Sequence, residues 1–568
     1  MRSAFVLLLA ALACGKPGRA PAVRAFREAG HIEARWQGEA LRIATAGFDL
    51  REELDAAPAS AGAARLPDDA RADAVWLTRP DGAREVGFVS SGAEGGNGAP
   101  WQIFAPEDFR GGELHVVFPA LPAGERLGIL FVNEGARDGA QVAVTADGLP
   151  AAAVAEAPSG QLRGALTMGT RPADAHETVR ALQEAQPTGT AAAPEMVASE
   201  EHRAFCVVRA LDFGHRVRKP ATRVATTAFA DFYVDDEDLS HYGADFFPAL
   251  AGAFEEKVRP AVWSAFGAPT DVDQNGKVEV LLTHELGASL NGGWLIGYFG
   301  NNDLLHSRDG SDGCGDSGSN HGEIVYLNDV ANAAANGYGA AEVAASVYPA
   351  TLAHELQHLI NLGRRCVERS CDGPEETWIN EALSKVAEDL AGFGWNAAQG
   401  RSEGARYLTR ASGQLRGYDA RSLTLWEGDP IGNYQGAHSF LRFFSDKLGP
   451  GLARTLVADG GGVGALEQAL QRPLPRAMAE WATALLLSNE QGTSFSYSGA
   501  EWSPFHQRLR HLDYVPLSGA ASTSLRTDGL AAFVTAAGPG GAAGIRVRSS
   551  EQRPPHVVVV RIAGDLPR

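Results

Sequence analysis

The chain alternates apolar and polar positions in short segments after residue 24. Segments such as EALRIATAGFDL and DAVWLTRPDG show the two-residue period of half-buried strands. Glycine, proline and aspartate separate these segments at short intervals. Regular short strands divided by such turns are typical of a β-sandwich. The pattern therefore predicts an N-terminal β-sandwich accessory domain over residues 24–148.

The pattern changes over residues 149–199, where alanine, proline and threonine dominate around one short helix-like segment. This composition is typical of a linker. The sequence leaves open whether a pro-segment is removed here.

Residues 200–495 mix strand and helix patterns. ATTAFADFYVDD and GEIVYLND have the character of strands, whereas ADFFPALAGAFEEKVRPAVWSAFG has the character of a helix. Helical patterns dominate from residue 341 to about residue 488, which predicts a central α+β domain. Residues 500–568 return to strand-like segments such as HVVVVRIAG. The expected architecture is therefore multidomain, with a small C-terminal β-rich module.

One predicted helix, over about residues 343–362, carries histidines at positions 354 and 358, and Gly363 is expected to end it. Residues four apart share one helix face, so His354 and His358 can direct both imidazoles at one metal ion. Zn2+ accepts such nitrogen ligands at about 2.0–2.1 Å. Glu355, beside them, could take a proton from a metal-bound water. Two satisfied core histidines are the alternative interpretation.

A second predicted helix downstream supplies a third ligand, Glu381. Catalytic zinc sites generally combine three protein ligands with one open position, and this acid weighs against the core-histidine alternative. Glu375, Glu376 and Glu388 are the competing acids, and each is more often a solvated charge.

Two further motifs carry candidate ligands. Asp271, Asp273 and Asn275 alternate before a glycine, as in the start of a calcium-binding loop, so Ca2+ is a candidate second ion. Position twelve of that loop is leucine instead of glutamate, and a tight turn rich in Asx residues is the competing interpretation. His284 also precedes a glutamate, but Ala288 stands where a second histidine is needed, so we interpret His284 as structural.

The His-Glu-x-x-His string followed by Asn-Glu-Ala-x-Ser resembles the gluzincin zinc metallopeptidases, of which thermolysin is the best known. Several blocks more closely resemble the hyicolysin-type family of bacterial secreted peptidases. These blocks are FYVDD (232–236), DVDQNGKVEVLL (271–282), GYFGNNDLL (297–305), GEIVYLND (322–329), TLAHELQHLIN (351–361), WINEALSKVAE (378–388) and NYQGAHSFLRFFSDKLG (433–449).

This resemblance implies a zinc endopeptidase acting on proteins or peptides, with His354, His358 and Glu381 as ligands and Glu355 as the catalytic acid and base. Related gluzincins carry an oxyanion donor on or near the next helix, where Tyr434 and His438 are the candidates.

One position departs from the pattern of the family. Gluzincins tend to carry a carboxylate four residues after the third ligand, and this chain has Lys385 there. Glu388 could replace that acid. A non-catalytic surface-binding protein with a degraded peptidase fold, and a zinc hydrolase of a non-peptide amide, are the alternative functions.

The N-terminus indicates export. The apolar run in MRSAFVLLLAALAC is shorter than the roughly 20 residues of a membrane span, so residues 1–13 are expected to form a signal peptide. The string ALAC resembles a lipobox, which makes Cys14 a candidate lipidation site, with ordinary cleavage after Ala13 as the alternative. The protein is then expected at the bacterial cell envelope or outside the cell.

Composition adds two expectations. The net charge of −19 argues against nucleic acid as a partner and leaves the lipid anchor as the membrane contact. Four further cysteines in an exported chain suggest disulfides. Cys366 and Cys371 could close a small loop, which leaves Cys206 with Cys314. We expect a monomer.

Overall fold

The computed structural model describes most of residues 101–149, 201–393, 430–487 and 514–563, residues 422–425, and the backbone of the strands between residues 23 and 88. The predicted signal peptide, Cys14 and nearly all of the predicted linker lie outside these residues.

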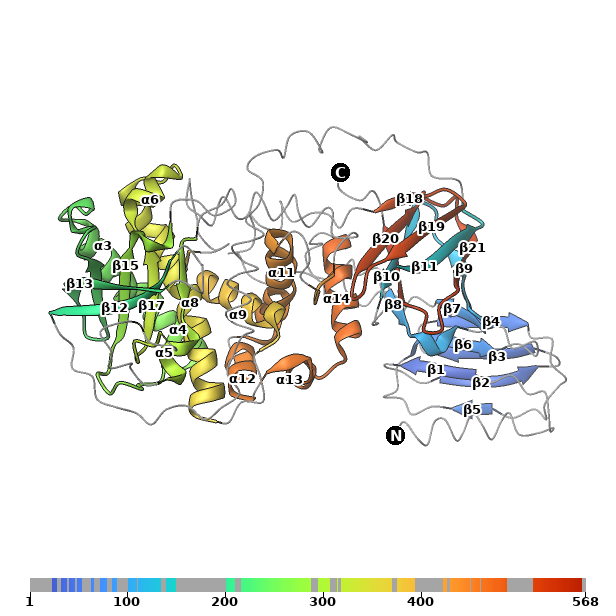
Figure 1. Cartoon of the computed structure of the whole chain (residues 1–568). Helices are drawn as coiled ribbons and strands as arrows, with labels where there is room; N and C mark the ends of the chain where they lie inside the picture. Colours follow the sequence, from blue (N-terminus) through green and yellow to red (C-terminus); the bar gives the residue numbers. More distant parts are fainter. Residues whose placement is uncertain are drawn as a thin grey trace.

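Two sheets form a β-sandwich at one end of the molecule (Figure 1). Its strands are β1 (Val23–Arg27), β6 (Ala72–Thr78), β7 (Arg84–Phe88), β8 (Trp101–Phe104), β9 (Glu113–Leu121), β10 (Glu125–Val132), β11 (Ala140–Asp147), β18 (Val515–Leu517), β19 (Ala520–Leu525), β20 (Leu530–Thr535), β21 (Gly541–Ser549) and β22 (His556–Ala563). The strand orders are β1-β6-β7-β9-β21-β11-β19 and β18-β20-β10-β22-β8.

A separate four-stranded sheet has the order β4-β3-β2-β5. Its strands are β2 (Ile32–Gln37), β3 (Ala40–Thr45), β4 (Phe48–Glu53) and β5 (Ala63–Arg65).

The strands at the end of the chain complete the sandwich that the N-terminal strands begin. β10 is hydrogen-bonded to β20 on one side and β22 on the other, and β21 lies between β9 and β11. This arrangement differs from the separate C-terminal module expected over residues 500–568. The reason lies in β10, whose two faces are both apolar. Each face must be buried in a hydrophobic core, and each edge must be hydrogen-bonded to a neighbouring strand.

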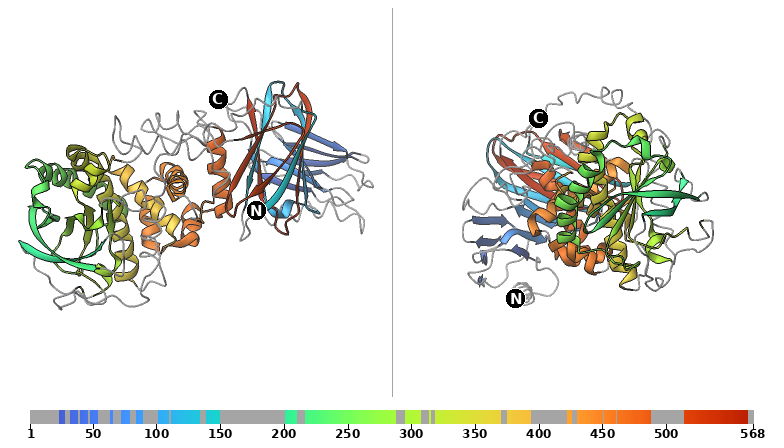
Figure 2. Two further views of the ribbon diagram at one scale, coloured as in Figure 1. Left: turned by 45° about the horizontal axis from the view of Figure 1, so that its top comes forward. Right: turned by 90° about the vertical axis from the view of Figure 1, so that its left-hand side faces the viewer.

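Alternate residues of β10 belong to two different hydrophobic cores. Ile129 and Phe131 face the interior of the sandwich, whereas Leu130 and Val132 join the core that reaches into the helical part of the chain. Helix α14 (Leu474–Leu487) packs on this outer face, as the left view of Figure 2 shows. A Cβ atom at Gly128 would lie 2.8 Å from Leu486 Cδ2, so glycine permits this close approach.

The central domain contains a six-stranded sheet with the order β12-β13-β14-β15-β17-β16. The strands are β12 (His202–Val208), β13 (Arg216–Thr226), β14 (Ala230–Asp235), β15 (Val278–Thr283), β16 (Gly297–Phe299) and β17 (Ile324–Asn328). β14, β15 and β17 run parallel, and β16 is an antiparallel edge strand. Both faces of this sheet are buried, because Val280 and Leu282 face one core and Leu281 faces another.

Helices pack against one face of this sheet and continue towards the sandwich (Figure 1). They are α3 (Phe246–Ala253), α4 (Arg259–Phe266), α5 (Asn301–Leu305), α6 (Val330–Ala335), α7 (Ala340–Glu342), α8 (Tyr348–Leu362), α9 (Thr377–Leu390), α11 (Pro430–Leu448), α12 (Gly451–Asp459) and α13 (Gly462–Leu470). None of the described helices combines the length and hydropathy that crossing a bilayer requires.

The predicted histidine-bearing helix is α8, preceded by a π-helical turn over Val343–Val347. Gly363 does not end it as a left-handed cap, because its φ of −56° is helical and the chain continues into a π-helical turn. A Cβ atom there would lie 2.9 Å from the side chain of Thr270. Glycine at position 363 therefore allows the Thr270 side chain to approach the helix backbone closely, a contact that local sequence does not reveal.

Candidate metal centre

Helices α8 and α9 bring the three predicted zinc ligands together. The Nε2 atoms of His354 and His358 lie 3.1 and 3.4 Å from the same Oε2 atom of Glu381, and all three ligand atoms lie within 4.8 Å of one another. Ligands bound at 2.0–2.1 Å in a tetrahedron are about 3.3 Å apart. Two imidazole nitrogens and one carboxylate at this spacing fit a zinc ion with little movement.

Charge inside the cluster favours metal binding. Burial would raise the pKa of Glu381, but His358 and His354 hold it well below its usual range. Burial lowers the pKa of His354, but hydrogen bonds with Glu381 and Glu388 raise it to about 10. These shifts favour an imidazolium paired with carboxylates when no ion is bound, and a bound cation would displace the imidazolium proton.

Glu388 contacts the ring nitrogen of His354 that faces away from Glu381 and so takes the place of the carboxylate that gluzincins carry four residues after the third ligand. Its Oε1 atom lies 2.8 Å from His354 Nδ1, and its other oxygen is ion-paired with Lys385. Both Lys385 and Glu388 are buried. The lysine that departs from the gluzincin pattern therefore anchors the acid that supports the ligand. A partner of this kind fixes the ring orientation and raises the basicity of a metal-binding histidine.

The other two competing acids lie just before α9 and contact no candidate ligand in the described residues. Glu375 accepts a hydrogen bond from the backbone N–H of Gly462. Glu376 accepts from Trp378 Nε1 at 2.8 Å.

Replacing Glu388 with glutamine should weaken zinc binding by about 10- to 100-fold, as loss of such outer partners commonly does. The amide keeps the shape but loses the negative charge that orients His354. Competition with a chromophoric chelator measures the affinity, and circular dichroism checks the fold. Glu376→Gln, at the residue that precedes the same helix, is the matched control. Equal zinc affinity in both variants would count against this role for Glu388.

Glu355 lies on α8 beside the ligands, with 7% of its surface exposed. Burial raises its pKa, while the imidazoles of His354 and His358 oppose that rise. The backbone N–H of Phe299, in the edge strand β16, also hydrogen-bonds its carboxylate. The sequence alone gave no signal for this contact, because nothing local marks a backbone group. A buried carboxyl with a raised pKa is suited to accepting and returning a proton.

Tyr434 and His438 both lie on α11, but in different surroundings. The ring of Tyr434 lies 6.3 Å from that of His354, centroid to centroid. His438 is fully buried, with Nε2 2.6 Å from Oδ2 of Asp389, which also accepts from Arg442 Nη1 at 2.7 Å. Tyr434 therefore borders the candidate metal ligands, whereas His438 belongs to a polar cluster that ties α11 to α9.

Ser384 is a further neighbour of the site that the predicted residue set omitted. Its Oγ atom lies 3.2 Å from Nδ1 of His358 and hydrogen-bonds the side chain of Gln357. The available signal was its spacing three residues after Glu381, which places both side chains on one helix face.

In the predicted calcium loop, Glu323 joins the two aspartates, and Asn275 hydrogen-bonds within the turn. Asp271, Asp273 and Glu323 place ligand-type atoms within 4.8 Å of one another. Burial raises the pKa of Asp273 to about 8 and that of Glu323 to about 7. Asn275 donates its amide N–H to Asp273 at 2.6 Å, and its oxygen accepts from the backbone of Lys277. Asn275 thus organises the turn and does not present a free oxygen to an ion.

A disulfide joins Cys206 in β12 to Cys314, with their Cα atoms 5.4 Å apart. Cys366 is buried at the end of the turn after α8. Cys371 lies outside the described residues, so its pairing with Cys366 stays a prediction.

Comparison with known proteins gives one relative and no family model. No protein-family model matches the sequence. The chain is 25% identical over 283 residues to the neutral metalloprotease ShpI of Staphylococcus hyicus, which is 48% of this chain and 58% of that protein. A solved structure of Escherichia coli alpha-2-macroglobulin activated by porcine elastase aligns with a TM-score of 0.11 and 11% identity, over 97% of this chain and 65% of that one, too weakly to inform the fold. The match to ShpI, together with the clustered ligands, supports a relationship of this chain to the metallopeptidases.

Proposed function

We propose that this protein is a zinc-dependent endopeptidase of the gluzincin type. The observation that carries the proposal is the convergence of Nε2 of His354, Nε2 of His358 and Oε2 of Glu381 on one point. The relationship to a neutral metalloprotease supports it.

The residues around this point divide the chemistry of peptide hydrolysis. Bound zinc would act as a Lewis acid and lower the pKa of its water towards about 7. Glu355 accepts the proton of the attacking water on its carboxylate and later returns it to the leaving amine. The Phe299 N–H orients that carboxylate. The hydroxyl of Tyr434, beside His354, donates a hydrogen bond to the oxyanion.

The peptide substrate is proposed to lie extended along β16. Of the two edge strands of the central sheet, β12 and β16, the strand β16 packs against α8. An edge strand offers backbone groups that pair with an extended peptide. Side chains of many kinds could then be accepted, because main-chain hydrogen bonds supply the affinity.

The experiment that tests this function is a peptide-library cleavage assay with and without a metal chelator. We expect internal peptide bonds to be cut, with activity lost to chelation and restored by zinc. No cleavage by zinc-loaded protein would favour a non-catalytic binding protein. Cleavage confined to non-peptide amides would favour a zinc hydrolase of such amides.

Replacing Tyr434 with phenylalanine should lower kcat by about 10²- to 10³-fold, the usual effect of losing one oxyanion donor. Zinc content should not change, because Tyr434 is not a ligand. The contrasting variant is His438→Gln, which should lower the free energy of unfolding while the folded fraction keeps its kcat. The two roles would be reversed if Tyr434→Phe kept the wild-type kcat while His438→Gln stayed folded and lost activity.

Calcium remains a proposal for the loop that contains Asp271 and Asp273. If Ca2+ binds there, a Ca2+ concentration of 100 times Kd should stabilise the folded state of chelator-treated protein by about 2.7 kcal/mol. The melting temperature should rise accordingly. Asp273→Asn should remove this rise, and the exposed Asp236→Asn should keep it. An unchanged melting temperature in calcium would favour the alternative of a tight turn.

Export completes the proposed function. The N-terminal sequence supports secretion, with Cys14 as the candidate lipid anchor. Proteins and peptides outside the cytoplasm would then be the substrates of a monomeric enzyme.

A further inference from the structure

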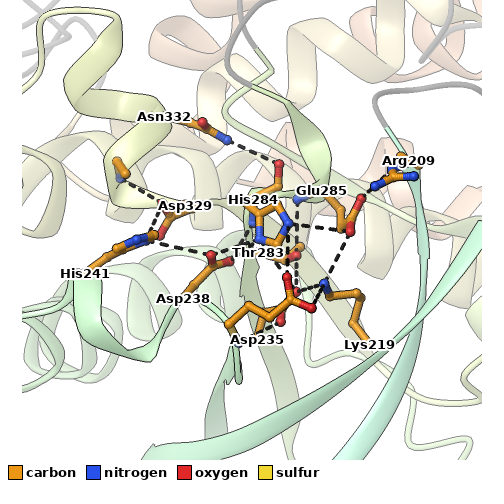
Figure 3. A network of polar contacts seen from close by, with 12 residues as sticks. Arg209, Lys219, Asp235, Asp238, His241, Thr283, His284, Glu285, Asp329 and Asn332 are labelled. Atoms are coloured by element: carbon orange, nitrogen blue, oxygen red, sulfur yellow. Dashed lines mark hydrogen bonds and ion pairs between the residues drawn. The ribbon is translucent and has the colours of Figure 1, made fainter.

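The three parallel strands of the central sheet each end in a residue that can bind metal. Asp235 is the last residue of β14, His284 directly follows β15, and Asp329 directly follows β17. The carboxyl ends of parallel strands meet at one edge of a sheet, where α/β proteins commonly bind ligands. Figure 3 shows these side chains gathered at that edge.

The turn after β14 adds Asp238 and His241 to the group. Nδ1 of His241 lies 2.9 Å from Oδ2 of Asp329 and 3.7 Å from Oδ1 of Asp238. These residues place three ligand-type atoms within 4.8 Å of one another. The same Oδ1 of Asp238 lies 2.8 Å from Nδ1 of His284, whose backbone N–H donates to Oδ2. His284 therefore holds the Asp238 carboxylate in place from the side opposite His241.

The nearby cations are engaged with other acids. Lys219 Nζ lies 3.3 Å from both Asp235 and Glu285, and Arg209 Nε lies 2.9 Å from Glu285. Figure 3 shows this part of the network on the side away from Asp329.

Asp238 and Asp329, by contrast, are 2% and 0% exposed. In the part of the chain that the structure describes, their contacts come from imidazoles, backbone N–H groups and a phenol. Among the described residues, the ion pairs of these two carboxylates involve only the imidazoles of His241 and His284, and no lysine or arginine lies against either of them.

Asp329 gives a second, independent indication. Its Oδ2 atom accepts from the backbone N–H of Ala331 and contacts His241. Its Oδ1 atom is buried and has no hydrogen-bond partner among the described residues. The phenol of Tyr242 forms a side-chain hydrogen bond with this carboxylate, but a neutral hydroxyl brings no positive charge. A buried carboxylate oxygen left in this state is costly, and a bound cation would satisfy it.

We propose that Asp238, His241 and Asp329 bind a second divalent metal ion, distinct from the ion at the catalytic centre. The class of ion is set by the donors. An imidazole nitrogen with carboxylate oxygens suits zinc better than calcium or magnesium, which prefer oxygen alone. His284 is a positioning residue for Asp238. The His241 side chain is 38% exposed, so an ion can reach the site from solvent.

Such an ion would join the turn after β14 to the start of α6 and so fasten two of the strand ends. The inference does not depend on the proposed peptidase activity, because no residue of this second site belongs to the catalytic centre.

The test is zinc content per chain, measured by elemental mass spectrometry on protein equilibrated with buffered zinc. We expect about two ions per chain in the wild type. His241→Gln should lose one of them and keep chelator-sensitive cleavage, and His358→Ala should lose the other. The control is Asp236→Asn, an exposed acid in the same turn, which should keep both.

The proposal of a second site would be wrong if the wild type held a single zinc ion, lost in His358→Ala and kept in His241→Gln. That result would leave the peptidase proposal intact. If His241→Gln does not fold, Asp329→Asn decides. It keeps a side-chain oxygen that can cap α6 and removes the charge. An unchanged count of two ions in that variant would also refute the proposal.

Discussion

Replacing Glu355 with glutamine should leave zinc bound and lower kcat/KM for peptide cleavage by about 10²- to 10⁴-fold. This is the range that a positioned general acid and base contributes. The amide keeps the size of the side chain but cannot accept the proton of the attacking water. Glu355 is not one of the three clustered ligands, so the metal affinity should not depend on it. Cleavage of casein and zinc content, measured on the same preparation, check both parts.

The matched control for this variant is Glu368→Gln. Glu368 lies just beyond the π-helical turn that follows α8 and forms an exposed ion pair with Arg364. Both its zinc content and its cleavage rate should equal those of the wild type. Near-normal cleavage by Glu355→Gln, with zinc present, would remove Glu355 from the mechanism. Loss of zinc from that variant would instead make Glu355 a ligand.

Replacing His358 with alanine should abolish cleavage by removing the ion itself. Loss of outer partners alone weakens metal binding by about 10- to 100-fold, and loss of a direct ligand should cost more than that. The remaining His354 and Glu381 would offer two ligands where catalytic zinc sites have three. We expect no detectable cleavage at micromolar zinc, with the fold retained by circular dichroism.

His202→Ala is the control for this second prediction. His202 is an exposed histidine that contacts the hydroxyl of Thr222 on the neighbouring strand. Zinc binding at the catalytic centre and cleavage should both survive its loss. If His358→Ala cleaved peptides at the wild-type rate, the reaction would not depend on an ion held by α8 and α9.

The two candidate histidine ligands could be predicted because their spacing is local. His354 and His358 share one face of a single helix, and Glu381 lies on a stripe beside the apolar stripe of the next helix. An apolar periodicity of 3.6 residues was enough to place each side chain on its own helix. The packing of α8 against α9 then places the three ligand-type atoms together, which the family resemblance implied and the helix patterns alone did not specify.

Contacts between distant segments could not be predicted in this way. The short apolar run of β10 indicates a strand but carries no information on its partners, β20 and β22, which lie near the other end of the chain. The same limit applies to Glu323 beside Asp273 and to Asp329 beside His241. Lys385 looked like a defect in sequence because its ion pair with Glu388, and the contact of Glu388 with His354, depend on two helices.

The most direct test of the account is a crystal structure of zinc-loaded protein with anomalous scattering recorded at the zinc edge. The account predicts an anomalous peak about 2.0–2.2 Å from Nε2 of His354, Nε2 of His358 and a carboxylate oxygen of Glu381. A peak coordinated without Glu381, or no peak between α8 and α9 at full zinc occupancy, would contradict it.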